Sequence, residues 1–243
     1  MSSASESRAP RWARSGRAAA LALAVAVVAA GCVAPPEGAV VDTSFLDEPP
    51  VVDPRTYTVR IRSQTCEGLG VGSGFLIDES TIVTNRHVVE GADSLEVETS
   101  EGEDLTVGVA SQGLLADLAI VRLDRPMASG MGQDTAELAA ANPEPGTDLQ
   151  AFGYPGGGPL TVTDGQVEDY QVDPRLGNLS KVIRSDVDIE PGSSGGPAVD
   201  DEDRVVGVVY AIEVATEKSL LVPVETLQRL LANDEGLEPV EGC

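Results

Sequence analysis

The sequence predicts an all-β fold made of two barrel-like halves followed by one C-terminal helix. Short segments of alternating apolar and polar residues recur along the chain, separated by Gly, Pro, Asp and Ser, as in β-sandwiches and barrels. A stretch rich in Ala, Gly and Pro, residues 125–146, divides these segments into two sets. Near the end, the apolar spacing changes to that of an amphipathic helix.

The expected strands fall into two groups. In the first half, about residues 56–125, they are 57–62, 70–77, 81–84, 94–99, 104–110 and 118–123. In the second half, about 146–222, they are 147–153, 159–167, 181–185, 197–199, 204–212 and 219–222. Pro223 opens the helix expected over 223–232, because proline suits the first helical position. The apolar face of that helix comprises Val224, Leu227, Leu230 and Leu231.

The N-terminus has the pattern of an export signal, predicted to span residues 1–31. Four arginines precede an unbroken apolar run from Ala18 to Ala30. That run is too short for a bilayer, which takes about 20 residues, but it suits a signal peptide. The following Ala-Ala-Gly-Cys resembles a bacterial lipobox, which would make Cys32 the lipidated first residue of the mature chain. Ordinary cleavage nearby, releasing a secreted protein, is the alternative.

Residues 32–55 are expected to be a disordered tether. They contain five prolines and several acids but no sustained apolar period. If Cys32 carries lipid, this segment holds the folded domain, residues 56–243, away from the membrane.

The three cysteines divide into one and two. Export places them in an oxidising compartment, where disulfides persist. With Cys32 assigned to lipid, Cys66 and Cys243 are left as a plausible pair. The alternative is two unpaired thiols, which would not last outside the cell.

The charge excludes one class of partner. Without residues 1–31 the chain has 12 basic and 39 acidic side chains, a net charge of −27. Nucleic-acid binding requires clustered Lys and Arg against phosphate, so we expect no nucleic-acid partner.

The segment Asp186–Pro197 contains a serine, Ser194, followed by two glycines. Closely spaced glycines let a backbone fold tightly and direct two N–H groups at one point, as an oxyanion hole beside a nucleophile requires. Gly, Ser and Pro also make ordinary surface turns. This segment alone does not decide between the two interpretations.

The chain has one histidine, His87, and therefore one imidazole that can act as a base near neutral pH. A lone histidine is more often structural. A serine nucleophile needs such a base, and the base needs an acceptor that orients it. Asp117 lies among apolar residues, where a carboxylate is costly unless it has a partner. His87 is the expected partner; capping of local backbone is the alternative.

Four motifs resemble the chymotrypsin-like serine endopeptidases, and most closely their HtrA-type bacterial branch, over about residues 56–232. They are Thr-Asn-Arg-His-Val-Val (84–89), Ala-Asp-Leu-Ala-Ile-Val (116–121), Gly-Tyr-Pro-Gly-Gly (153–157) and Pro-Gly-Ser-Ser-Gly-Gly-Pro (191–197). Mycobacterial envelope proteases of this branch also have a cysteine just before the first barrel and another near the C-terminus.

The resemblance implies two six-stranded antiparallel β-barrels and a catalytic triad. Ser194 is expected to be the nucleophile, His87 the general base and acid, and Asp117 the residue that orients His87. The backbone N–H groups of Gly192 and Ser194 are expected to form the oxyanion hole. No cofactor or metal is implied, and the expected partners are protein or peptide substrates.

The resemblance also implies a substrate site. Val209, Tyr210 and Ala211 match the strand that pairs with substrate backbone and lines the primary pocket. Asp188 matches the pocket floor of trypsin-like members, where an acid favours a basic side chain before the scissile bond. In the HtrA-type branch the pocket has a different shape, and Asp188 is then only a structural acid.

Two features depart from the HtrA-type pattern. Ser193 stands where many relatives have Asn or Asp, so two serines adjoin the predicted chemistry. The residues after Ala232 are too few for the PDZ domain that usually tethers substrates. The sequence therefore predicts an exported serine endopeptidase acting on envelope or extracellular proteins. The alternative is a non-catalytic or latent module that binds ligands or senses stress on the same scaffold.

Overall fold

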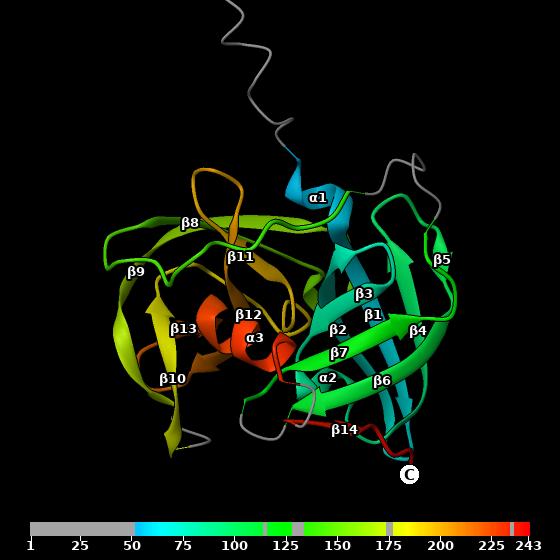
Figure 1. Ribbon diagram of the computed structural model, residues 1–243. Helices are drawn as coiled ribbons and strands as arrows, with labels where there is room; N and C mark the ends of the chain where they lie inside the picture. Colours follow the sequence, from blue (N-terminus) through cyan, green and yellow to red (C-terminus); the bar gives the residue numbers. More distant parts are fainter. Residues whose placement is uncertain (1–51, 114–115, 128–133, 174–176, 234–235) are drawn as a thin grey trace, which may run out of the picture. The chain divides into compact units, whose positions relative to one another are not determined.

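The computed structural model describes residues 52–113, 116–127, 134–173, 177–233 and 236–243 (Figure 1). The predicted signal peptide, Cys32 and most of the predicted tether lie outside these residues. No helix in the described ranges is both long and apolar enough to cross a membrane.

The first half of the chain forms one antiparallel sheet. Its strands are β1 (Thr58–Thr65), β2 (Gly68–Asp78), β3 (Thr81–Thr84), β4 (Ala92–Thr99), β5 (Asp104–Leu105), β6 (Val107–Gly113) and β7 (Ala119–Leu123), joined by β14 (Leu237–Pro239) from the C-terminal tail. Their spatial order is β14-β6-β7-β3-β2-β1-β4-β5. All of these strands except β14 come from the segments predicted for the first barrel, and the strand expected over 104–110 is divided into β5 and β6. With β14, the described residues of this half form an eight-stranded sheet in place of the predicted six-stranded barrel.

The second half closes into a six-stranded barrel, as predicted. The strands are β8 (Asp148–Gly153), β9 (Thr161–Asp173), β10 (Gly177–Ser185), β11 (Pro197–Val199), β12 (Val205–Glu213) and β13 (Lys218–Pro223). The barrel order is β10-β13-β12-β11-β8-β9. The all-β prediction is confirmed, and β3 and β11 have the predicted bounds.

Short helices fill the connections. They are α1 (Pro54–Tyr57), α2 (Arg86–Val89) and the 3₁₀ turn η2 (Pro155–Gly157). Each is too short to show a helical period in the sequence. In α1, the Asp53 side chain accepts from the backbone N–H of Arg55, and Pro54 occupies the first helical position. This helix begins two residues before the domain boundary expected at residue 56.

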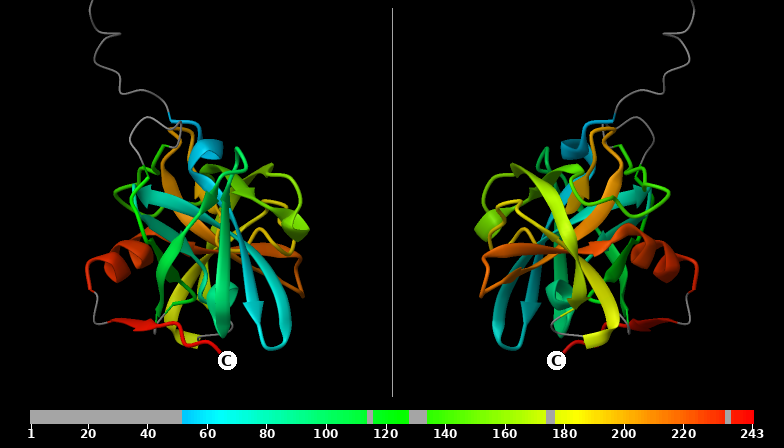
Figure 2. Two further views of the ribbon diagram at one scale, coloured as in Figure 1. Left: turned by 90° about the vertical axis from the view of Figure 1, so that its right-hand side faces the viewer. Right: turned by 90° about the vertical axis from the view of Figure 1, so that its left-hand side faces the viewer.

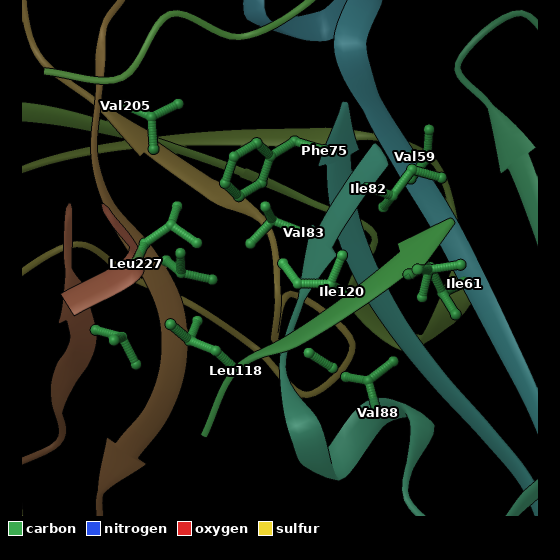
Figure 3. Close-up of a cluster of buried hydrophobic side chains, with 14 of the residues drawn as sticks. Val59, Ile61, Phe75, Ile82, Val83, Val88, Leu118, Ile120, Val205 and Leu227 are labelled. Atoms are coloured by element: carbon green, nitrogen blue, oxygen red, sulfur yellow. The ribbon is translucent and has the colours of Figure 1, made fainter. Parts of the chain in front are cut away.

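The C-terminal helix α3 (Val224–Leu231) follows Pro223 as expected. Val224 and Leu227 are fully buried, and Leu230 and Leu231 pack against the core with part of their surface exposed. Figure 3 shows Leu227 in one cluster of buried side chains with Val205 of β12, Val83 of β3 and Leu118, which precedes β7. The helix therefore helps to close the core that joins the two halves.

The core alternates along the strands as a half-buried sheet requires. In β1, Val59 and Ile61 point inward and are fully buried, while Arg60 and Arg62 are more exposed. A second cluster, which includes Leu149, Ile183 and Leu221, fills the closed barrel. Burial of this apolar surface is the main stabilising contribution to the scaffold that carries the site.

The C-terminal tail returns to the first sheet. β14 pairs with β6, Leu237 opposite Gly113, and a bond of 2.01 Å joins the sulfurs of Cys66 and Cys243. Figures 1 and 2 show this red segment running below β6 toward the base of the β1–β2 hairpin. The tail pairing was not predicted, because Leu-Glu-Pro is too short for a strand signal.

Loss of the Cys66–Cys243 bridge is expected to lower the free energy of unfolding. The bridge spans 177 residues, and a loop of this size is worth about 5 kcal/mol on the chain-entropy model. Urea unfolding of Cys66→Ser/Cys243→Ser, compared with oxidised and with dithiothreitol-treated wild-type protein, measures the effect. The reduced wild type should match the double variant. Equal midpoints for oxidised and reduced protein would contradict the expected contribution.

Candidate active site

Strand pairing brings His87 and Asp117 together. β3 ends at Thr84 opposite Ala119 of β7, so the residues after β3 lie beside those before β7. His87 follows β3 on α2, whose Val88 and Val89 are buried and fix the helix on the core. Asp117 precedes β7 between the buried Ala116 and Leu118.

The Asp117 carboxylate holds His87 at two points. One oxygen, Oδ1, accepts from the His87 backbone N–H at 2.9 Å, and Oδ2 lies 2.8 Å from Nδ1 of the ring. The carboxylate side chain is only 12% exposed, against 36% for the imidazole. An ionised carboxylate can only accept, so Nδ1 is the donor of this hydrogen bond, and in the neutral ring the lone pair is then on Nε2. The side-chain NH₂ of Asn85 donates to the Asp117 carbonyl at 2.7 Å.

Ser194 lies in the turn between β10 and β11, where the two halves of the domain meet. Its carbonyl accepts from the backbone N–H of Ser73 in β2 at 2.8 Å. Its hydroxyl lies 3.4 Å from the carbonyl oxygen of Tyr210 in β12. The Tyr210 ring is in turn 6.4 Å from the His87 ring, centroid to centroid. Ser194 and His87 thus both approach Tyr210, and Asp117 is joined to His87.

The turn before Ser194 has the backbone shape that only glycine adopts easily. Gly192 has φ +104°, and a Cβ there would lie 2.5 Å from the Tyr154 carbonyl oxygen. The Pro191 carbonyl accepts from Gly156, and the Gly192 carbonyl accepts from the Ser73 hydroxyl at 2.8 Å. Within the described chain, the N–H groups of Gly192 and Ser194 donate to no acceptor. Both donors are therefore available to a ligand.

The glycine after the serine is also required by packing. Gly195 has φ +89°, and a side chain would collide with the Ser73 carbonyl oxygen and the Thr84 hydroxyl. Its N–H donates to the Val209 carbonyl at 2.8 Å. This close approach ties the turn to both sheets.

Ser73, which the sequence analysis did not single out, connects the parts of the site. Besides its bonds to Gly192 and Ser194, its hydroxyl accepts from the backbone N–H of Tyr154 at 2.9 Å. The side chain is fully buried. A serine within a glycine-rich strand has no distinctive pattern, so sequence alone offered no signal for it.

Arg60 supports the Tyr154 turn from the first sheet. Its guanidinium donates to the carbonyls of Gly157 and Gly158 and lies 5.5 Å from the Tyr154 ring centroid. The hydrogen bond with Arg60 lowers the pKa of Glu98, and burial raises the pKa of Tyr154 to about 12. The Gly-Tyr-Pro-Gly-Gly motif is therefore a support for the Gly192 turn.

The predicted substrate strand has an open edge. β11 pairs with β12 only as far as Val208, and Val209 bonds to Gly195 and Gly196. No ladder is recorded on that side of β12 for Tyr210 to Glu213 within the described residues. Val209, Tyr210 and Ala211 all have buried side chains, so an added peptide would meet chiefly their backbone.

Asp188 lies on an exposed part of the turn before Ser194. Its side chain is exposed and lines a cavity of about 50 Å³ with Ser193, Glu190 and residues of β8 and β9. This cavity lies on the β8–β9 side of the turn, whereas Val209 to Ala211 belong to β12.

Comparisons with known proteins show the family of the chain. Residues 72–208, more than half of the chain, match the trypsin-like peptidase domain family. The serine protease Rv3671c of Mycobacterium tuberculosis is 28% identical over 182 residues, covering 71% of this chain and 44% of the relative. The HtrA serine protease of Bacillus subtilis is 32% identical over 152 residues, covering 57% and 33%. The chain thus spans less than half the length of these curated relatives.

A solved structure extends the likeness to three dimensions. The active form of the Rv3671c protease from M. tuberculosis superposes with a TM-score of 0.68 at 26% identity, over 83% of this chain and 91% of that one. Residues 72–208, which match the family, include His87, Asp117 and Ser194. On these grounds, the chain belongs to the trypsin-like peptidase domain family and has HtrA-type serine proteases among its relatives.

Proposed function

We propose that the protein is a serine endopeptidase that hydrolyses peptide bonds through an acyl-enzyme, with Ser194, His87 and Asp117 as its triad. The observation that carries this proposal is the contact of Asp117 with both the backbone and the ring of His87. The His87 ring and the Ser194 hydroxyl both approach Tyr210, and the turn of Ser194 leaves two N–H groups without internal acceptors. A purely structural histidine would not need this arrangement around it.

The proposed reaction uses the same groups in acylation and in deacylation. Ser194 Oγ attacks the peptide carbonyl carbon while its proton passes to Nε2 of His87, and Asp117 stabilises the imidazolium through Nδ1–H. The N–H groups of Gly192 and Ser194 bind the oxyanion. His87 then gives the proton to the leaving amine as the C–N bond breaks. Water repeats the cycle on the ester and releases the acid.

The Ser194 hydroxyl must rotate to enter this reaction, because it lies near the Tyr210 carbonyl in this structure. Catalytic hydrogen bonds are often long in ligand-free enzymes and tighten with substrate. A peptide added along the open edge of β12 would need the Tyr210 carbonyl for its own N–H, which frees the hydroxyl for His87.

Burst kinetics test the acyl-enzyme directly. With a p-nitrophenyl ester, the protein should release about one equivalent of nitrophenol before slower steady turnover, because deacylation is the slower half of ester cleavage. It should also cleave a fluorogenic casein. Absence of both burst and turnover, together with retained peptide binding, would favour the non-catalytic binding module.

Ser73→Ala is expected to lower kcat about 10- to 100-fold with little change in KM, because Gly192 loses the hydroxyl that fixes its peptide. Steady-state kinetics with a peptide substrate measure both constants. Ser94→Ala, which removes an exposed hydroxyl on β4, is the control and should match wild type. An unchanged kcat for Ser73→Ala would show that the turn holds its shape without this contact.

We further propose that the protein is exported and anchored by lipid on Cys32, with residues 32–55 as a tether. The basic and apolar N-terminal segment and the Ala-Ala-Gly-Cys motif support this. Expression of the full chain in a bacterial host, followed by detergent-phase partitioning, tests it. Wild type should enter the detergent phase and Cys32→Ser should not; equal partitioning would contradict the anchor.

The preference for the residue before the scissile bond is tested separately. Asp188 favours arginine there only if its carboxylate reaches the primary pocket, and its place on the β8–β9 side supports the alternative of a structural acid. Matched peptides with Arg or Val at that position decide between the two. A clear preference for Arg that disappears in Asp188→Asn would restore the basic specificity.

A further inference from the structure

A cleft beside His87 extends the proposed site away from β12. It encloses about 720 Å³. The residues that line it come from the β1–β2 hairpin, from α2 and the bend after it, and from the disulfide: Ser63, Thr65, Cys66, Glu67, Gly68, Leu69, Gly70, His87, Glu90, Gly91 and Cys243. We propose that this cleft binds the leaving-group side of the substrate and selects a basic side chain there. The proposal rests on the peptidase function above.

The direction of the substrate follows from the neighbours of Ser194. Its hydroxyl approaches β12 through Tyr210, whereas its carbonyl is bonded to β2 through Ser73. A peptide whose acyl side lies along the open edge of β12 must therefore cross Ser194 toward β2. His87 delivers its proton to the leaving amine, so the leaving segment starts beside His87. The cleft is lined by His87 and begins there.

β2 offers this segment a free strand edge. β3 pairs with β2 only from Phe75 to Asp78, and β1 occupies the opposite edge along the whole of Gly68–Phe75. Both backbone groups of Ser73 are occupied: its N–H donates to the Ser194 carbonyl, and its carbonyl accepts from the Thr84 hydroxyl at 2.6 Å. From Gly68 to Gly72, the described chain shows no backbone–backbone hydrogen bond to a strand other than β1. A peptide can add here by strand pairing. Running from Ser73 toward Gly68, it would lie antiparallel to β2.

The register places particular substrate residues near particular side chains. We count one substrate residue for each residue of β2, with the first residue after the scissile bond opposite Gly72. The second, third and fourth residues then lie opposite Val71, Gly70 and Leu69. Glu67 lies just beyond Leu69, in the turn of the β1–β2 hairpin. The Leu69 side chain is 78% exposed and supplies an apolar surface for the stem of a long side chain.

The negative charge of the cleft favours a basic side chain on the leaving-group side of the substrate. Among the described residues that line it are the carboxylates of Glu67 and Glu90 and neither Lys nor Arg. Glu90 is ion-paired with Arg86 at 2.8 Å, while Glu67 forms no ion pair within the described chain. Glu67 is therefore the free anion that a leaving-group Arg or Lys meets, and an acidic side chain there is repelled.

A peptide series tests this inference. All members share one acyl-side sequence, and Arg or Glu is placed in turn at the second, third and fourth positions after the scissile bond. We expect kcat/KM to be about three- to five-fold higher for the best Arg position than for Glu there. The ratio should fall in 0.5 M NaCl because partly exposed charges are screened. Glu67→Gln should bring it close to one.

Two controls separate this inference from the peptidase function. An ester of the same acyl sequence has no leaving peptide, so Glu67→Gln should not change its hydrolysis. Glu101→Gln is the matched control. Gly91 of the cleft precedes β4 and Glu101 follows that strand, so this variant should keep the wild-type Arg-to-Glu ratio. Two results would overturn the cleft proposal alone, provided that wild type hydrolyses the ester. The first is an Arg-to-Glu ratio of kcat/KM equal to one in wild type, and the second is a ratio that Glu67→Gln leaves unchanged. Failure of wild type to hydrolyse the ester would overturn the peptidase function.

Discussion

Ser194→Ala is expected to lower kcat about a million-fold, the loss seen when a serine peptidase is deprived of its nucleophile. Without Oγ no acyl-enzyme can form, whereas the oxyanion donors and the substrate edge of β12 remain. The folded structure should be retained, because the hydroxyl makes one long contact, to the Tyr210 carbonyl at 3.4 Å. Peptide hydrolysis measures the rate, and thermal unfolding checks the fold.

Ser193→Ala is the matched control, because the two serines are adjacent. The Ser193 backbone N–H donates to the Glu190 carbonyl at 3.0 Å, and its side chain lines the small cavity with Asp188. Alanine preserves the backbone contact, so this variant should retain most of the activity. If Ser193→Ala were inactive and Ser194→Ala active, the assignment of the nucleophile would be wrong.

Asp117→Asn is expected to lower kcat about ten-thousand-fold, the second largest effect. An amide in place of the carboxylate can present an N–H toward Nδ1. This favours the ring tautomer with the proton on Nε2, which can no longer take the proton from Ser194. The loss therefore arises from the two contacts at 2.9 and 2.8 Å that Asp117 makes with His87.

The pH profile distinguishes this cause from general destabilisation. Hydrolysis by Asp117→Asn should recover partly at high pH, where hydroxide can replace the histidine base, while a merely unfolded variant would stay inactive at all pH values. Asp124→Asn, an exposed acid after β7, is the control and should behave as wild type. Wild-type kcat in Asp117→Asn at neutral pH would contradict the proposed role.

Local patterns were enough to predict most of the strands. Turn residues located the short strands β3 and β11 to the residue, because their flanks are strong breakers. The same reasoning did not predict α2 or β14. Both are held by tertiary contacts: buried Val88 and Val89 in one case, and the pairing with β6 and the disulfide in the other.

The candidate site was predictable to the extent that its chemistry is rare in this chain. The single histidine limited the choice of base, and Asp117 stood out because apolar residues surround it. Ser73 and Arg60 could not be found in the same way, because their roles depend on which strands become neighbours. The orientation of Asp188 likewise depends on the three-dimensional path of the turn and not on its spacing from Ser194.

The most direct test of the proposed mechanism is covalent labelling with a fluorophosphonate, followed by intact-mass measurement and peptide mapping. The account predicts one adduct per chain, located on Ser194, absent in Ser194→Ala, retained in Ser193→Ala and strongly slowed in Asp117→Asn. A folded wild-type protein that gains no adduct, or one that is modified on Ser193, would contradict it.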